Sequence, residues 1–141
     1  KLKAIGYNDN EIKAFAAENS LNTIDDEGEV IEREARPSDK FVSPYTNQQS
    51  ARAANGGAYP PDLSLIVKAR SDEANYLHAL LTGYVDAPSE KKVPDGMYYN
   101  KYYSGNLIGM PQPLCEDGVT YADGTKATTE QMARDGTALL A

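Results

Sequence analysis

The chain has 141 residues, enough for one domain with a modest core, and its 21 acidic and 14 basic side chains give a net charge of -7. This acidic balance argues against a nucleic-acid-binding protein, which would carry a basic stripe. The single cysteine, Cys115, excludes an intramolecular disulfide and a metal site built only from cysteines, and no apolar run reaches the roughly 20 residues of a membrane-spanning helix.

The amino-terminal third is predicted to form one helix and an acidic segment. In NDNEIKAFAAEN, Asn8 is followed three residues later by Glu11, which is the capping-box pattern of a helix start. Residues 20–40 then form an acidic excursion around Gly28. Its acidic residues are Asp25, Asp26, Glu27, Glu29, Glu32 and Glu34. Alternating side chains in GEVIERE permit a short β arm near residues 24–36, whereas the high charge density favours a solvated loop.

Three further helices are predicted in the rest of the chain. DLSLIVKAR predicts a helix that Asp62 caps. DEANYLHALLTG predicts a second helix that ends at Gly83, because its apolar residues recur at helical spacing. TTEQMARDGTALLA opens with Thr128 and Gln131 in capping-box spacing, while the interior Gly136 costs about 1 kcal/mol and weakens the end of this helix.

The stretch of about forty residues between the last two predicted helices shows no periodicity, which is uncommon in a compact domain unless the segment wraps something. The expected fold class is therefore mostly α with long ordered loops, with the permitted β arm near its start. A large apolar cofactor would supply the filling that the short helices lack. Residues 1–141 as a whole are expected to form a single domain.

The segment NLIGMPQPL places Met110 in a stiff loop. Pro111 and Pro113 forbid a continuing helix and remove two backbone donors, so the methionine lies in extended chain. A methionine is normally a gap-filling core residue. A rigid Gly-Met-Pro loop beside a tyrosine cluster favours the alternative that the thioether is an axial ligand of an iron. The tyrosines are Tyr98, Tyr99, Tyr102 and Tyr103.

His78 is the only histidine, which excludes a metal site with two histidines. Its flanks in YLHALL predict a partly exposed helix position, and the sequence gives no reason for a reactive pair with Cys115. The glycines of AANGG match no phosphate-binding loop, and DDEGE lacks the register of a calcium-binding loop. The residues therefore give little support to a hydrolase or a nucleotide-binding protein.

Four blocks of the sequence, in this order, resemble the cytochrome c1 family, the haem-bearing subunits of the cytochrome bc1 complex. The blocks are ARAANGGAYPPDLSLIVKAR, YLHALLTGY, DGMYYNKYYSGNLIGMPQPL and YADGTKATTEQMARD. The resemblance implies a class I cytochrome c-like haem domain with haem c as its cofactor and with Met110 as the axial ligand of the haem iron. It also implies six further residues that contact the haem, namely Asn55, Pro61, Arg70, Tyr76, Leu80 and Leu81.

Most of these six residues also have an ordinary structural explanation. Arg70 would pair with a haem propionate, which suits a guanidinium, or it is a solvated cation at a helix end. Pro61 would lie against the ring. Asn55 precedes two glycines and would serve equally as a turn residue. Tyr76 and the two leucines share one helical face. For these three residues, packing in the protein core and packing against a haem predict nearly the same pattern.

The C-x-x-C-H haem-attachment motif and the carboxy-terminal membrane anchor of the family do not occur in these 141 residues. The resemblance therefore implies a fragment of a longer cytochrome, with the covalent attachment site shortly upstream of Lys1 and with membrane attachment through the anchor. His78 is not expected to replace the proximal histidine, because the family has an ordinary side chain at that position.

The function that the resemblance implies is electron transfer from the Rieske iron–sulfur protein to a soluble cytochrome c, beside cytochrome b in a complex expected to be dimeric. The chain would be an electron-carrier subunit of the ubiquinol–cytochrome c reductase and no enzyme on its own. It would lie on the periplasmic side of the bacterial inner membrane or the intermembrane-space side of the mitochondrial inner membrane.

Two alternatives stay open on the sequence. The acidic excursion would guide a basic cytochrome c, or it is only a solvated surface. The whole chain would otherwise be a non-haem, loop-rich extracytoplasmic binding or structural module with a tyrosine face.

Overall fold

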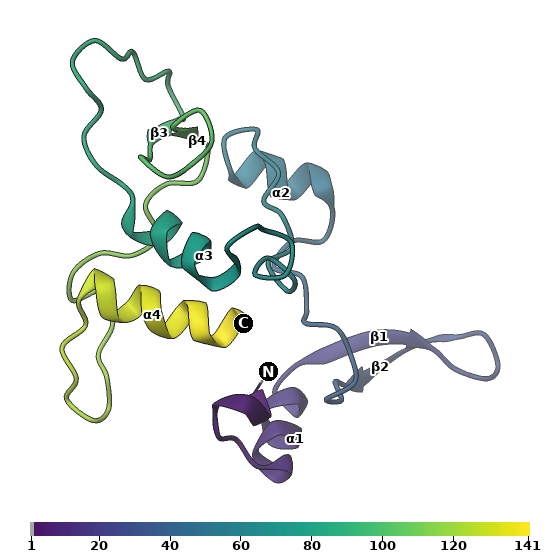
Figure 1. Cartoon of the computed structure of the whole chain (residues 1–141). Coiled ribbons are helices and arrows are strands. Elements are labelled where there is room, and N and C mark those ends of the chain that lie inside the picture. The colour runs from purple at the N-terminus through teal and green to yellow at the C-terminus, as the bar shows by residue number, and fades with distance from the viewer. Residues whose placement is uncertain (1) are drawn as a thin grey trace. The chain divides into compact units, whose positions relative to one another are not determined.

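The computed structural model describes residues 2–141 and divides the chain into two compact units, residues 1–47 and residues 48–141. The predicted single domain stays a prediction, and each unit is described by itself. The first unit contains the 3-10 helix η1 (Leu2–Ile5), the helix α1 (Asp9–Ala17) and an antiparallel hairpin of β1 (Ser20–Ile24) and β2 (Val30–Glu34) (Figure 1).

Helix α1 begins where the sequence predicts. The side chain of Asn8 accepts hydrogen bonds from the backbone N–H groups of Asn10 and Glu11, each at 3.0 Å. The Glu11 carboxylate in turn accepts from the N–H of Asn8 at 2.8 Å. This reciprocal capping box satisfies donors that the first turn of a helix leaves without intrahelical partners. The predicted capping box is confirmed.

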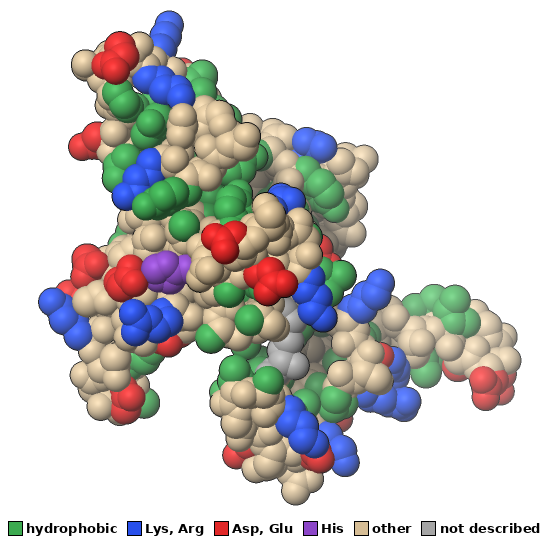
Figure 2. Space-filling model, viewed as in Figure 1, with side chains coloured by type: hydrophobic (Ala, Val, Ile, Leu, Met, Phe, Trp, Pro, Cys, Tyr) green, Lys and Arg blue, Asp and Glu red, His purple; other side chains and the backbone are tan. Residues whose placement is uncertain are grey.

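The β arm that the sequence permits near residues 24–36 is present as a hairpin of residues 20–34, in place of the solvated loop that the charge density favours. Ile24 lies opposite Val30 beside the turn. Asp25 holds the turn, because its carboxylate accepts from the backbone N–H groups two and four residues further on, at 3.0 and 2.9 Å. Gly28 has a φ of +86°, which a side chain would strain. Figure 2 shows acidic side chains at the far end of this arm. The acidic excursion is therefore an ordered hairpin with an acidic tip.

An ion pair fixes the chain where it leaves the hairpin. Arg33 donates two hydrogen bonds to the carboxylate of Asp39, at 2.7 and 3.0 Å. The backbone N–H of Arg36 donates to the same carboxylate at 2.8 Å. The Arg33 guanidinium, followed by this N–H, lowers the pKa of Asp39 to about 2. The segment after β2 is thus folded back onto the base of the hairpin.

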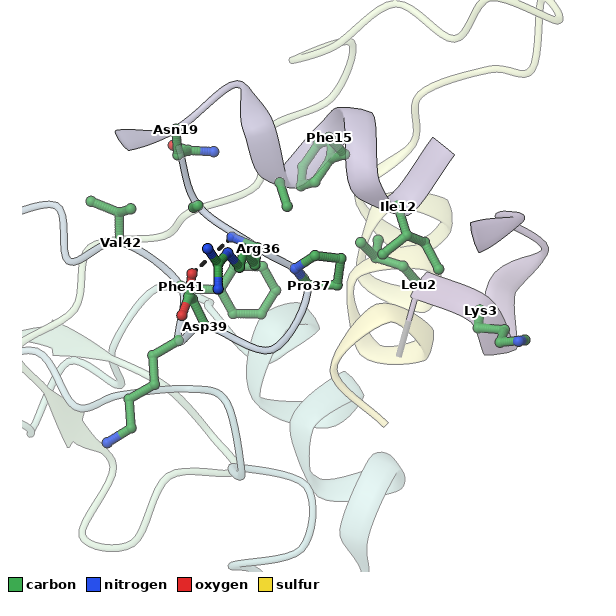
Figure 3. Close-up of a pocket in the computed structure, with 13 residues that line it drawn as sticks. Leu2, Lys3, Ile12, Phe15, Asn19, Arg36, Pro37, Asp39, Phe41 and Val42 are labelled. Carbon is green, nitrogen blue, oxygen red and sulfur yellow. Dashed lines mark hydrogen bonds between the residues drawn. The ribbon is translucent and has the colours of Figure 1, made fainter. Parts of the chain in front are cut away.

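The first unit also has an open groove of about 490 Å³. Figure 3 shows that helical residues such as Leu2, Ile12 and Phe15 line one side and that Pro37 and Phe41, from the segment after the hairpin, line the other. The lining is mainly apolar. None of the residues that the resemblance implies for a haem belongs to this groove.

The second unit contains α2 (Gln48–Ala54), α3 (Glu73–Thr82), the short strands β3 (Tyr98–Tyr99) and β4 (Leu107–Ile108), and α4 (Thr129–Leu140). Helices α3 and α4 lie side by side and hold half of the buried apolar residues (Figure 1). The buried apolar residues are Ala51, Val67, Leu77, Leu80, Ile108, Ala127, Met132 and Ala133. Among residues 2–141, no helix combines the length and the apolar character that crossing a membrane requires.

Helix α4 starts at the predicted cap. The Thr128 hydroxyl accepts from the N–H of Gln131 at 3.1 Å. A second cap comes from the preceding loop, where the Glu116 carboxylate accepts from the N–H of Thr129 at 2.8 Å. This hydrogen bond lowers the pKa of Glu116. The helix runs through Gly136 to its end, so this glycine does not break it.

One predicted helix is wrong, because residues 62–70 are not helical and residues 64–69 form successive turns. The carboxylate of Asp62 accepts from the N–H of Ser64 at 2.8 Å, which closes a local turn instead of capping a helix. The apolar residues of the segment build no continuous buried face, since Val67 is buried at 6% exposed whereas Leu63 is 44% exposed. The structure has its additional helix at α2, outside the stretches predicted to be helical.

Over the described residues 2–141, the fold class is as predicted in its main features, with four α-helices, long irregular stretches and two small antiparallel sheets. The core is small for the length of the chain. The chain exposes 10426 Å², whereas two separate compact units of these sizes would expose about 8,500 Å² together. Large apolar side chains such as Phe41 and Leu65 are left exposed, at 72% and 66%.

Candidate functional site

Met110 lies in the loop that directly follows β4. Its side chain is half-buried, whereas Pro111 and Pro113 are exposed. Both prolines fix their own φ and lack an N–H group, which stiffens the chain after the methionine. Between them, the side-chain amide of Gln112 donates to the carbonyl of Leu114 at 2.9 Å. Met110 is therefore carried by an ordered loop.

A tyrosine 26 positions earlier in the chain holds the backbone of Met110. Tyr84 follows the end of α3, and its hydroxyl donates to the carbonyl oxygen of Met110 at 3.0 Å. The phenol is half-buried, and burial raises its pKa to about 12. Tyr84 is therefore protonated at neutral pH and serves as a hydrogen-bond donor.

Asn100 ties the loop between β3 and β4 to the end of α3. It is fully buried, at 0% exposed. Its side-chain amide donates to the carbonyl of Leu80 at 2.8 Å. Its side-chain oxygen accepts from the N–H groups of Tyr102 and Tyr103, at 3.0 and 3.2 Å. One asparagine thus satisfies an acceptor and two donors of the surrounding backbone.

Gly83 makes this close approach possible. A Cβ atom at this position would lie 2.6 Å from Oδ1 of Asn100, 2.7 Å from Cδ2 of Tyr102 and 2.8 Å from the carbonyl oxygen of Ala79. Two of these neighbours are a fully buried side chain and a helix backbone, which have little room to move. The absence of a side chain therefore lets the loop pack against the end of α3.

The turn after α2 contacts the Met110 loop. Asn55 is half-buried there, and its side-chain amide donates to the carbonyl of Ala51 at 2.7 Å. The turn continues through two glycines with positive φ to Ala58. A Cβ built on Gly109 would lie 3.5 Å from the Cβ of Ala58, an ordinary contact distance. The residue before Met110 is therefore packed against this turn.

Helix α3 carries three of the residues implied for a haem. Leu80 is buried, at 9% exposed, while Tyr76 and Leu81 are half-buried. The carbonyl of Leu80 is the acceptor for Asn100, so the loop between β3 and β4 is anchored at the same end of the helix that carries both leucines.

Pro61 and Arg70 are exposed in the turns between α2 and α3. The guanidinium of Arg70 donates to the carbonyl of Ala69 at 3.5 Å, the long limit of a hydrogen bond. The structure thus brings together Met110, the Asn55 turn and the end of α3. Pro61 and Arg70 lie on the surface of the same unit.

His78 occupies the partly exposed helix position that the sequence predicts. Its Nε2 atom lies 3.1 Å from the carboxylate of Glu130, so it links α3 to α4. Figure 2 shows this histidine, in purple, among acidic and basic side chains. Cys115 is exposed and its thiol is free.

Comparison with known proteins assigns the family. The model of the cytochrome C1 family matches the chain over residues 1–141. The chain belongs to the cytochrome c1 family. One relative is "Cytochrome c1 1, heme protein, mitochondrial" of Arabidopsis thaliana, 48% identical over 99% of this chain and 46% of the relative. The resemblance seen in the sequence is therefore confirmed.

Two other cytochrome c1 relatives extend the comparison to fungi and bacteria. "Cytochrome b-c1 complex catalytic subunit, mitochondrial" of Candida albicans is 48% identical over 95% of this chain and 47% of the relative. "Cytochrome c1" of Rhodospirillum rubrum is 42% identical over 99% of this chain and 57% of the relative. The chain thus spans about half the length of the curated relatives it matches.

Proposed function

We propose that this chain is part of a haem-binding electron carrier in which Met110 is an axial ligand of the iron of haem c. The observation that carries the proposal is the half-buried thioether of Met110, on a loop whose backbone Tyr84 and the Asn55 turn hold in place. Membership of the cytochrome c1 family supports it. The Arabidopsis relative is named a heme protein.

The residues present fit such a group. A thioether is a soft ligand that suits haem iron. The segment around Pro61 exposes the apolar side chains of Tyr59, Leu63 and Leu65, at 54%, 44% and 66%. A porphyrin ring would cover apolar surface of this kind, which is otherwise costly to leave in water. The underfilled core of the chain agrees with a large apolar cofactor.

The part of each residue follows from its chemistry. When bound, haem c supplies reversible one-electron transfer. As a ligand, the Met110 sulfur would favour ferrous iron and so raise the reduction potential. The guanidinium of Arg70 would pair with a propionate, which suits its charge and its several donors. Tyr76 and Leu81 would exclude water from one side of the ring, and Asn55 would order the turn that packs on the ligand loop.

The wider assignment follows the family. We place this carrier between the Rieske iron–sulfur protein and a soluble cytochrome c, beside cytochrome b in a dimeric complex. The Candida relative is named as a subunit of the cytochrome b-c1 complex, which supports this placement. The domain would be class I cytochrome c-like, with covalent attachment of the haem and the membrane anchor in other parts of the protein. The carrier would face the periplasm or the mitochondrial intermembrane space.

Absorption spectroscopy of the purified full-length protein tests the haem assignment. We expect a red protein with a sharp α-band after reduction, because a c-type haem stays attached through purification. A colourless protein, expressed where haem is attached to other c-type cytochromes, would contradict the assignment. It would favour the non-haem binding or structural module instead.

The acidic tip of the β1–β2 hairpin gives a second prediction. A variant in which four of its carboxylates are neutralised should associate about tenfold more slowly with a basic cytochrome c at low ionic strength, because electrostatic steering is lost. Its association rate should also depend less on salt, while the haem potential stays unchanged. Stopped-flow electron transfer over a range of ionic strengths measures both. The four substitutions are Asp25→Asn, Asp26→Asn, Glu27→Gln and Glu29→Gln.

The asparagine at position 25 keeps the side-chain oxygen that accepts the turn hydrogen bonds, so the hairpin should stay intact. A matched control removes the same charge from exposed sites in the second unit. Its substitutions are Asp86→Asn, Glu90→Gln, Asp95→Asn and Asp117→Asn. If association slows equally in both variants, the effect comes from net charge alone and the hairpin has no specific role in association.

A further inference from the structure

We propose that Tyr84 is a positioning residue for the axial ligand, and that its hydrogen bond to the backbone of Met110 sets how firmly the sulfur stays on the iron. This inference rests on the proposed haem function. It assigns a role to a residue outside the seven implied by the resemblance. Tyr84 would act through the backbone of Met110 and not by contact with the iron.

The hydrogen bond joins two segments that are 26 positions apart. The Tyr84 hydroxyl donates to the carbonyl of Met110 itself, the residue whose side chain carries the sulfur, at 3.0 Å. The carbonyl carbon is bonded to the Cα atom of Met110. A shift of this peptide group therefore turns the whole methionine side chain relative to its surroundings.

The donor side of this bond is held more firmly than the acceptor side. Tyr84 directly follows Gly83, which the fully buried Asn100 and the last turn of α3 enclose. Tyr84 also pairs with Asn100 in an antiparallel bridge. Met110, by contrast, starts a loop whose next two prolines are exposed. The tyrosine thus connects the Met110 loop to the enclosed end of α3.

The free energy of this hydrogen bond is large enough to affect the competition between Met110 and an added ligand for the iron. A hydrogen bond of this kind contributes about 1 kcal/mol, and more when its loss leaves a half-buried carbonyl without a partner. A ligand-on state favoured by about 1 kcal/mol is favoured about fivefold over a ligand-off state. Removing the hydroxyl should therefore make it about fivefold easier for an added ligand to displace the methionine.

The test is a titration of the oxidised, haem-loaded full-length protein with imidazole, which competes for the sixth position of the iron. Tyr84→Phe removes the hydroxyl and keeps the ring. We expect its apparent affinity for imidazole to rise about fivefold. We also expect a weaker methionine–iron charge-transfer band and a lower reduction potential. Urea unfolding of each variant shows how much stability is lost.

Tyr121→Phe is the matched control, because the Tyr121 hydroxyl donates to Asp135 on α4 and not to the Met110 loop. It should leave the imidazole affinity and the potential at wild-type values. A Tyr84→Phe protein that loses stability but binds imidazole like the wild type would make Tyr84 purely structural and overturn the inference. Met110→Leu separates the two proposals. If it too binds imidazole like the wild type, the ligand assignment itself fails.

Discussion

Met110→Leu is expected to lower the reduction potential of the haem by a sizeable part of the roughly 0.8 V over which axial ligands set it. Leucine has nearly the volume of methionine but lacks the sulfur that stabilises ferrous iron. Haem attachment should survive, since we propose that the covalent bonds lie in other parts of the protein. Electron transfer from the Rieske centre would become uphill, and quinol oxidation would stall although the complex assembles.

The chain offers two internal controls for this substitution. Met132 is buried on α4, at 7% exposed, and Met97 is half-buried in the loop before β3. Both are interpreted as packing residues, so leucine at either position should cost less than about 1.5 kcal/mol of stability and leave the potential alone. A redox titration of the three variants decides the matter. If Met110→Leu titrates like the wild type, Met110 is not a ligand.

The elements that the sequence predicts correctly are those with local signals. The helix that starts after Asn8 and the one that starts after Thr128 both depend on a cap whose partners are three residues away. The end of α3 at Gly83 is also a local signal. Such interactions are complete within one turn of chain, so a sequence pattern contains all of their partners.

The wrong helix shows where this reasoning stops. Asp62 and the apolar residues after it have helical spacing, but the structure uses Asp62 in a turn and leaves Leu65 exposed. Spacing predicts a helix only if a surface is available to bury its apolar side. Which surface that is depends on distant parts of the chain, and here much of it would belong to a cofactor.

The candidate site also has features that the local sequence predicts and features that depend on distant residues. The stiffness of the Met110 loop can be predicted from its prolines, and the other haem-contacting residues follow only from the resemblance. The supporting residues Tyr84 and Asn100 were not predicted, because their acceptors lie 26 and 20 positions away. A weak signal exists for Asn100, as a polar residue amid four tyrosines. Nothing in the sequence states that its side chain is fully buried.

Asn100→Ala should be the most destabilising single substitution near the site. It removes one partner of the Leu80 carbonyl, which also accepts from the N–H of Gly83 at 3.4 Å, and the partner of the part-buried N–H groups of Tyr102 and Tyr103. Each buried group left without a partner costs about 1–3 kcal/mol, so the expected loss is about 3–5 kcal/mol. This is a large part of the roughly 5–15 kcal/mol that stabilises a typical domain. Urea unfolding of the haem-loaded protein measures it.

Asn75→Ala is the control, because Asn75 is an exposed residue of α3 whose side chain donates to Asp72 at 3.2 Å. Its effect should stay within about 0.5 kcal/mol. A loss below about 1 kcal/mol for Asn100→Ala would mean that water replaces the missing side chain and that the loop is not anchored there. If the loss of stability is large, the methionine–iron band should weaken as well. Tyr84 pairs with Asn100 in a β-bridge and donates its hydroxyl to the Met110 carbonyl, so a disturbance at Asn100 would reach Met110 through Tyr84.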